Sequence, residues 1–242
     1  MAQAQGKVEE ITFFSESLQE DLTLMIYLPS TFSPLYKYTL LIAQDGRDYY
    51  TLGRTPRVLE ELLSEENIEQ TIFVGIPYKS VEDRRQKYHP EGAQHDQYVR
   101  FLAHELVPFL DERFPTLQMG KARALIGDSL GATVSLTAAL TYPHTFGKVI
   151  MQSPYVDESV LEQVKQSEHV SLLDLYHIIG TEETAVSTTD GKVQDFLEPN
   201  RSLHTLMQEK NYSVFYEEFA GNHTWKYWQK DLKRALEMML KN

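Results

Sequence analysis

Short, continuous runs of apolar residues alternate along this chain with longer segments in which apolar residues recur every three or four positions. The runs are too short for helices and are typical of strands buried on both faces of a sheet. The wider spacing predicts helices that pack one face against that sheet. The predicted strands are residues 38–43, 71–77, 122–126, 148–151, 172–179 and 213–219. The predicted helices are residues 57–63, 98–114, 132–142, 160–165, 200–210 and 225–240.

Two earlier segments, residues 11–15 and 22–28, are rich in β-forming residues, and the second ends at Pro29. They predict an antiparallel hairpin that turns around residues 17–21. The alternation of strands and helices after it predicts right-handed crossovers and an α/β fold with a doubly wound, mostly parallel sheet. The sequence shows no internal repeat and no linker rich in proline, glycine or serine, so we expect a single domain over residues 1–242.

The composition excludes several classes of site and partner. The chain has no cysteine, which excludes disulfides, thiolate metal sites and a cysteine nucleophile, and which fits a reducing compartment. Its formal net charge of -12 argues against a nucleic-acid partner, because binding the phosphate backbone requires a basic face. The acidity is interpreted as solubility, with attraction of a cationic substrate as the alternative.

Membrane and export signals are also missing from the sequence. No window approaches the roughly 18 consecutive apolar residues that a membrane helix requires. Residues 1–7 lack the apolar stretch of a signal peptide. We therefore expect a cytoplasmic protein without a membrane partner. The sequence does not indicate its oligomeric state.

The strongest chemical signal is the segment at residues 127–131, Gly-Asp-Ser-Leu-Gly, which lies between a predicted strand and a predicted helix. It fits the pattern G-x-S-x-G in the strand–turn–helix context that exposes a nucleophilic serine. The two glycines let the strand and the helix approach each other without a Cβ clash. The turn also lies at the carboxyl end of a strand, where open α/β sheets bind ligands. We expect Ser129 to be a nucleophile.

A nucleophilic serine needs a base, and the expected position of this base is a loop after the last strand. Of the eight histidines in the chain, His223 alone lies between the strand at residues 213–219 and the closing helix. There it could take the proton of Ser129 and return it to a leaving alcohol. The other histidines are interpreted as surface or packing residues.

The segment at residues 127–131 and the sequence Gly-Asn-His-Thr-Trp-Lys-Tyr-Trp at residues 221–228 together resemble α/β-hydrolases of the enterochelin-esterase and esterase D type. The mycolyltransferase antigens resemble the chain more distantly. The segments at residues 44–46 and 105–108 are similar to that group as well, and the resemblance extends over residues 11–240. It implies the α/β-hydrolase fold and a serine esterase that acts on a small-molecule ester through an acyl-enzyme. Many members have glycine where this chain has Asn222, which changes only loop flexibility.

The acid that would orient His223 should follow the predicted strand at residues 172–179. The family pattern Gly-x-x-acid implies Glu183 for this role, and Asp190 is the alternative. Three further carboxylates lie in the same window: Glu182, Asp195 and Glu198. The task of this acid would be to hold the imidazole of His223 in one tautomer and to stabilise the imidazolium.

Two backbone amides are expected to form the oxyanion hole, those of Leu130 and Arg47. Gly46 would permit the tight turn that aims the Arg47 amide inward. The alternative is an ordinary glycine turn with an exposed Arg47.

The surroundings of the site can be predicted only in outline. Residues 153–170 leave room for one short helix, so we expect a minimal cap or none, and an open, shallow pocket. Four aromatic residues could line it: Tyr49, Tyr50, Tyr155 and Trp225. Arg84 and Arg85 could contact an anionic group but are interpreted as part of a solvated charge run.

No metal-binding or nucleotide-binding motif is present, so we expect neither a metal nor another cofactor. Two other functions remain open. One is acyl transfer to an alcohol by the same residues. The other is a catalytically silent binding module.

Overall fold

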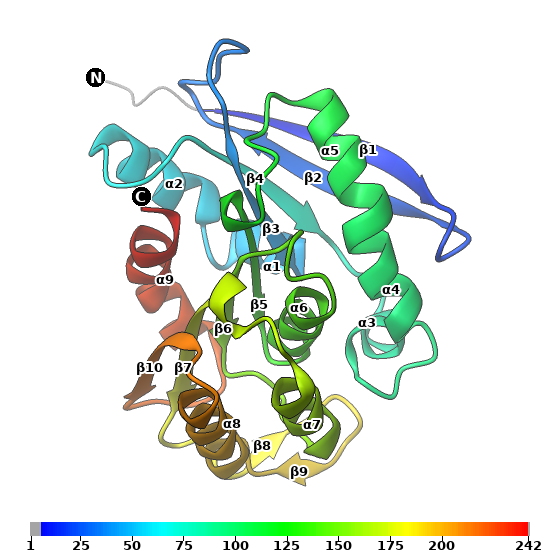
Figure 1. Ribbon diagram of the computed structural model, residues 1–242, viewed down its shortest axis with the longest axis vertical. Helices are drawn as coiled ribbons and strands as arrows, with labels where there is room; N and C mark the ends of the chain where they lie inside the picture. Colours follow the sequence, from blue (N-terminus) through cyan, green and yellow to red (C-terminus); the bar gives the residue numbers. More distant parts are fainter. Residues whose placement is uncertain (1–5, 242) are drawn as a thin grey trace.

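The computed structural model describes residues 6–241, and its centre is an eight-stranded sheet in the order β1-β2-β4-β3-β5-β6-β7-β10 (Figure 1). The strands are β1 (Lys7–Ser15), β2 (Glu20–Leu28), β3 (Thr39–Gln44), β4 (Thr71–Ile76), β5 (Arg123–Asp128), β6 (Lys148–Gln152), β7 (Asp174–Gly180) and β10 (Ser213–Phe219). Strand β2 pairs antiparallel with both β1 and β4, and the remaining pairs are parallel. The predicted mostly parallel sheet and its antiparallel N-terminal hairpin are confirmed.

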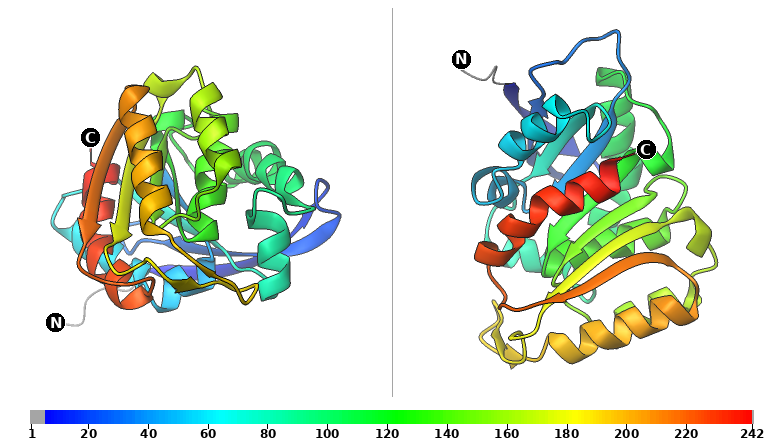
Figure 2. Two further views of the ribbon diagram at one scale, coloured as in Figure 1. Left: turned by 90° about the horizontal axis from the view of Figure 1, so that it is seen from below. Right: turned by 90° about the vertical axis from the view of Figure 1, so that its left-hand side faces the viewer.

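Helices cover both faces of the sheet (Figures 1 and 2). They are α1 (Gly46–Thr51), α2 (Thr55–Ser64), α3 (Val81–Tyr88), α4 (His95–Phe101), α5 (Val107–Arg113), α6 (Leu130–Thr141), α7 (Glu158–Gln166), α8 (Leu197–Glu209) and α9 (Trp225–Leu240). Leu41 and Ala43 of β3 pack in the layer formed with α1, α2 and α9. Leu40 and Ile42, which alternate with them, belong to the core shared with α3 to α8. The continuous apolar runs are therefore strands buried on both faces, as predicted.

Several elements differ from the sequence-based prediction. Strand β1 begins at Lys7 and not at residue 11. The prediction was too short because β1 is an edge strand, whose first residues are mostly polar and lie at the surface. The predicted helix at residues 98–114 is divided into α4, a π-helical turn at Leu102–Leu106, and α5. Pro108, near the start of α5, has no amide hydrogen to donate, which favours such an interruption.

Helices α1 and α3 were not predicted, since they are short and carry too few apolar residues for a periodic pattern. Helix α3 is stabilised instead at its start, where the Ser80 hydroxyl accepts a hydrogen bond from the Asp83 amide at 3.1 Å.

The parallel strands β5, β6, β7 and β10 end at one edge of the sheet, and their loops form the surface there. The connection from β6 to β7 carries α7 and one further short turn, so it is as small as predicted. The connection from β7 to α8 carries a two-stranded hairpin, β8 (Val186–Ser187) and β9 (Val193–Gln194). Both ends of this segment meet at Glu183, whose carbonyl oxygen accepts hydrogen bonds from the amides of Phe196 at 2.9 Å and Leu197 at 3.3 Å.

Within residues 6–241, no helix combines the length and the apolar character that crossing a membrane would require. The prediction about an export signal rests mostly on residues 1–5, which lie outside the described residues.

Candidate active site

Ser129 occupies the sharp turn between β5 and α6. Its backbone has φ 52° and ψ −125°, a conformation that residues other than glycine adopt rarely, and its amide donates to the Gln152 carbonyl at 3.0 Å. A Cβ atom on Gly127 would lie 2.1 Å from the carbonyl carbon of Gly131. The strand and the helix therefore pass so closely that only glycine fits at Gly127, as the motif predicts.

His223 lies in the loop between β10 and α9, and its Nδ1 atom is 2.7 Å from Oε2 of Glu183. A carboxylate only accepts hydrogen bonds, so this contact places the ring proton on Nδ1 and leaves Nε2 as the free base. The imidazole ring is also packed edge-to-face against Phe196, at 4.7 Å between centroids, and Trp228, at 4.9 Å. These contacts fix both the tautomer and the orientation of the ring.

Glu183 is completely buried, at 0% exposure, and both of its carboxylate oxygens are occupied. While Oε2 contacts His223, Oε1 accepts hydrogen bonds from the Ser153 hydroxyl at 2.7 Å and from the Gly180 amide at 2.9 Å. A Cβ atom on Gly180 would lie 2.7 Å from Oε1, so glycine is required at the end of β7 for the carboxylate to fit.

Ser153 and Trp228 form a second layer of contacts behind Glu183 and were not found from the sequence. The Ser153 hydroxyl, which donates to Glu183, accepts a hydrogen bond from the indole Nε1 of Trp228 at 3.0 Å. The neighbouring Gln152 side chain accepts from the Tyr49 hydroxyl at 2.9 Å and donates to the Trp228 carbonyl at 3.0 Å. Nothing local in the sequence distinguishes a serine at a strand end, because its partners lie 30 and 75 residues away.

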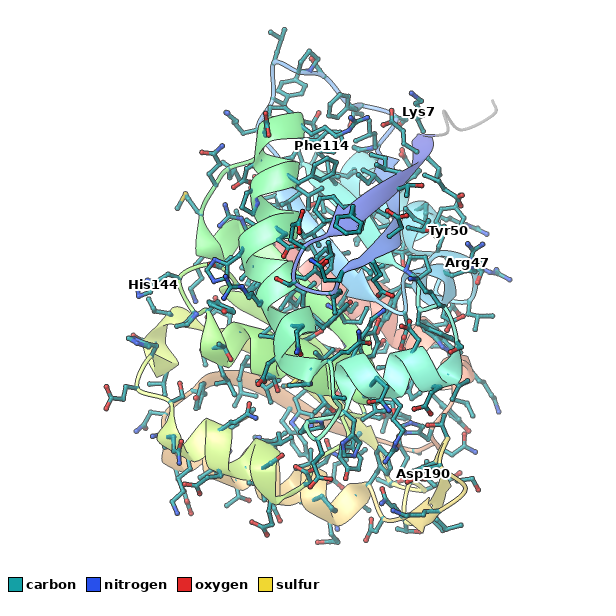
Figure 3. All side chains as sticks on the ribbon, turned by 90° about the vertical axis from the view of Figure 1, so that its right-hand side faces the viewer. Lys7, Arg47, Tyr50, Phe114, His144 and Asp190 are labelled. Carbon is teal, nitrogen blue, oxygen red and sulfur yellow. The ribbon has the colours of Figure 1, made fainter. Side chains whose placement is uncertain are left out.

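Asp190, the alternative acid, lies at the tip of the β8–β9 hairpin (Figure 3). Its carboxylate accepts a hydrogen bond from Thr188 at 2.5 Å and forms ion pairs with Lys192 at 3.3 Å and Arg85 at 3.4 Å. The Thr188 hydrogen bond and the contacts with Lys192 lower the pKa of Asp190 to about 2.

The remaining carboxylates of that window have other partners or lie at the surface. Glu182 is exposed, Asp195 caps the first turn of α8, and Glu198 pairs with Arg201. Of the five candidate acids, Glu183 is therefore the one that the structure brings to His223.

The two residues predicted for the oxyanion hole lie at the starts of two helices. Leu130 is the first residue of α6. Arg47 lies in the first turn of α1 with an exposed side chain, near the edge of the molecule in Figure 3. The left-handed residue of this turn is Asp45, with φ 53°, and not Gly46. Gly46 is needed for a different reason, since a Cβ atom there would lie 2.3 Å from the backbone of Gly75 in β4.

Ser129 and His223 line the same pocket, whose volume is about 500 Å³. The β8–β9 hairpin supplies one wall, α3 another, and the aromatic residues Tyr155, Phe196 and Trp225 much of the rest. Of the aromatic residues predicted to line the site, Tyr155 and Trp225 do so. Tyr49 is buried beneath Trp225, and Tyr50 lies near the edge of the view in Figure 3.

The interpretation of Arg84 as part of a solvated charge run is wrong. Its side chain is only 11% exposed and lines the pocket, where Nε and Nη2 donate to both carboxylate oxygens of Asp45 at 2.6 to 3.0 Å. Nη2 also donates to the Asp128 carbonyl at 3.3 Å. This pair has no local signal in the sequence, because α3 has no apolar stripe and Asp45 precedes Arg84 by 39 residues.

Within residues 6–241, no group of three or more histidine, cysteine and carboxylate side chains is placed to hold a metal ion. The pocket brings Ser129 together with His223, whose ring contacts the buried carboxylate of Glu183.

Comparisons with known proteins show the family and the fold of the chain. The model of the family described as "Putative esterase" matches residues 15–239. The chain is 56% identical over 240 residues to the protein named Uncharacterized protein YjcH of Bacillus subtilis (strain 168), and the match covers 99% of this chain and 100% of that one.

Two solved structures share the fold. A ferulic acid esterase superposes with a TM-score of 0.81 at 16% identity and covers 98% of each chain. The enterobactin esterase FES from Shigella flexneri superposes with a TM-score of 0.81 at 20% identity, covering 96% of this chain and 58% of that one. The predicted α/β-hydrolase fold and the resemblance to the enterochelin-esterase type are thus confirmed. The chain belongs to the esterase family whose model it matches, and it is a carboxylic ester hydrolase.

Proposed function

We propose that the chain hydrolyses a small-molecule carboxylic ester through an acyl-enzyme on Ser129, with His223 as the general base. The hydroxyl oxygen of Ser129 attacks the ester carbonyl carbon while Nε2 of His223 takes the hydroxyl proton. The same proton passes to the leaving alcohol as the ester C–O bond breaks, which leaves the acyl group on Ser129. A water molecule, deprotonated by Nε2, then attacks the acyl carbon. The bond from this carbon to the Ser129 oxygen breaks, the proton on Nε2 returns to that oxygen, and the acid is released.

The observation that carries this proposal is the contact of 2.7 Å between His223 and the buried carboxylate of Glu183, in a pocket that Ser129 also lines. A carboxylate held by two further donors can fix the imidazole and stabilise its protonated form during each proton transfer. A pocket of about 500 Å³ with aromatic walls is of the size that binds small molecules.

The negative charge that develops on the carbonyl oxygen needs hydrogen-bond donors placed in advance. We assign this role to the backbone amides of Leu130 and Arg47. Leu130 directly follows the nucleophile, and the twelve residues of α6 align their dipoles so that its N-terminus favours negative charge.

Covalent labelling tests the identity of the nucleophile. A fluorophosphonate probe should form a stable adduct with Ser129 in the folded protein, because only an activated serine reacts at a useful rate. Peptide mapping by mass spectrometry should locate the adduct on residues 127–131. The Ser129→Ala variant should remain unlabelled, and an adduct on another serine would refute the assignment.

A second prediction concerns the contacts behind the acid. Ser153→Ala leaves Oε1 of Glu183 with one donor and leaves the Trp228 indole without its partner, so turnover should fall by about ten- to a hundredfold. Because Ser153 acts through Glu183 and does not touch the substrate, kcat should fall while KM changes little.

Ser135→Ala is the matched control for this experiment, because Ser135 is also fully buried but its hydroxyl donates only to the Gly131 carbonyl in α6. Its turnover should stay near that of the unmodified chain. Equal effects of the two substitutions would mean that Ser153 is an ordinary buried serine.

A further inference from the structure

Three carboxyl groups, those of Asp45, Asp48 and Asp128, gather in the pocket beside Ser129, and we call them the carboxyl cluster. Asp45 and Asp48 flank the start of α1, and Asp128 directly precedes the nucleophile at the end of β5. They come from segments about eighty residues apart that the parallel pairing of β3 and β5 brings together.

The guanidinium of Arg84, which lies beside this cluster, forms its ion pair with one member. Arg84 contacts both carboxylate oxygens of Asp45, a residue that is only 2% exposed. Among residues 6–241, no ion pair reaches Asp48 or Asp128. Two carboxyl groups of the cluster therefore have no cation of their own.

Asp128 is the more unusual of the two. It is 7% exposed, and its buried oxygen Oδ1 has no hydrogen-bond partner among the described residues. Asp48 is half-buried, and among the described residues its carboxylate accepts one side-chain hydrogen bond, from the Tyr78 hydroxyl at 3.5 Å. A buried carboxyl group without a partner is costly, so in folded proteins such a group usually has a ligand or a function.

The remaining charges of the pocket do not neutralise the cluster. Arg85 and Lys192 both pair with Asp190 of the β8–β9 hairpin, at 3.4 and 3.3 Å. Glu91 adds a further carboxylate to the lining. The three cations that line the pocket thus pair with two carboxylates, Asp45 and Asp190, and none of them forms an ion pair with Asp48 or Asp128.

Burial and the neighbouring carboxylates both raise the pKa values of Asp128 and Asp48. Burial, followed by the charges of Asp45 and Asp48, raises the pKa of Asp128 well above its usual range, and Arg84 only partly opposes this. Burial and Asp45 likewise raise the pKa of Asp48. Tyr49, Tyr78 and Tyr88, which also face this region, have raised pKa values and bring no positive charge. Arg47 opposes the rise of the Asp48 pKa, but as the smallest of its causes. A bound cation would replace the proton that these surroundings favour.

We propose that the carboxyl cluster is a subsite for an ammonium group of the substrate, whose N–H donates to Asp128 and whose charge is also attracted by Asp48. Trp225 lines the same pocket, and an aromatic side chain can add to the binding of such a cation. This inference rests on the proposed function and names its substrate class, an ester that carries a protonated amine close to the ester bond.

Pairs of esters with the same shape and different charge test the proposal. The first pair is 2-(dimethylamino)ethyl acetate, which carries a protonated amine, and 3-methylbutyl acetate, its neutral isostere. The second pair places the amine on the acyl side, as methyl 3-(dimethylamino)propanoate and methyl 4-methylpentanoate. Binding is measured by ligand-observed NMR titration of the Ser129→Ala chain, in which the esters persist, and kcat/KM is measured with the intact Ser129.

In at least one pair, the cationic ester should bind the Ser129→Ala chain about tenfold or more tightly than its isostere at low ionic strength, and added salt should reduce the ratio. Adding Asp128→Asn should bring the ratio close to one while preserving the shape of the side chain. Glu162→Gln, the same change of charge at an exposed position on α7, is the matched control and should leave the ratio unchanged.

Equal affinities within both pairs, or a preference that survives Asp128→Asn, would overturn the inference. Because binding is measured on a chain that lacks the nucleophile, this outcome is distinct from failure of the proposed function. That failure would appear as absence of turnover with Ser129 intact, whatever the binding ratio.

Discussion

His223→Ala should lower ester turnover by roughly five orders of magnitude, since it removes the base that Glu183 orients in the pocket of Ser129. What remains should reflect the backbone donors and substrate binding, which do not depend on the imidazole. The measurement is kcat on purified, folded protein with a small acyl ester such as an acetate. Circular dichroism should show that the fold persists.

The control for this substitution is His144→Ala, because His144 is exposed and lies far from the hairpin that carries Asp190 (Figure 3). Its turnover should match that of the unmodified chain. If His223→Ala retained turnover within about tenfold of normal, the role of base would pass to another residue.

Glu183→Gln should lower turnover by several thousandfold, although glutamine has nearly the same shape as glutamate. The amide can present an N–H to Nδ1 of His223 and so favour the wrong imidazole tautomer, in which Nε2 carries the proton. The amide also cannot balance the positive charge of the imidazolium that forms during the reaction. The measurement is a pair of turnover rates, for this variant and for Asp190→Asn, with thermal melting of each protein as the test of folding.

Asp190→Asn should leave turnover nearly unchanged, since Asp190 contacts Thr188, Lys192 and Arg85 and not His223. The reverse pattern, a large loss at Asp190 and a small one at Glu183, would make Asp190 the acid. Small losses at both positions would indicate that Ser129 and His223 act as a dyad.

The residues whose signals are local could be predicted from the sequence. Ser129 is marked by a strand, two glycines and a helix within about a dozen positions, and His223 by its place after the last strand. The candidates for the acid could be narrowed to the loop after β7, because this loop begins where the predicted strand ends. Within that loop, the family pattern implied Glu183. Its distinction from Asp190 depends on burial, which the sequence does not encode locally.

Features that depend on distant partners could not be predicted. The ion pair of Arg84 with Asp45 joins α3 to the end of β3, and the contact of Ser153 with Trp228 joins the end of β6 to α9. The order of strands and helices was predictable from continuous apolar runs and helical spacing. Elements without such patterns, namely the edge residues of β1, the polar helix α3 and the short β8–β9 hairpin, were missed or shortened.

The segment after β7 has two tasks: Glu183 contacts His223, and the β8–β9 hairpin forms one wall of the pocket. The Glu183 carbonyl accepts the amides of Phe196 and Leu197, so the segment leaves and re-enters the fold at one fixed point. Lengthening a closed loop costs little free energy, about 0.6 kcal/mol for each doubling. Residues 184–195 can therefore diverge between relatives in length and composition while the carboxylate of Glu183 stays in place. Changes in residues 184–195 can therefore alter this wall of the pocket, and with it the substrate preference, while Glu183 and His223 keep their positions.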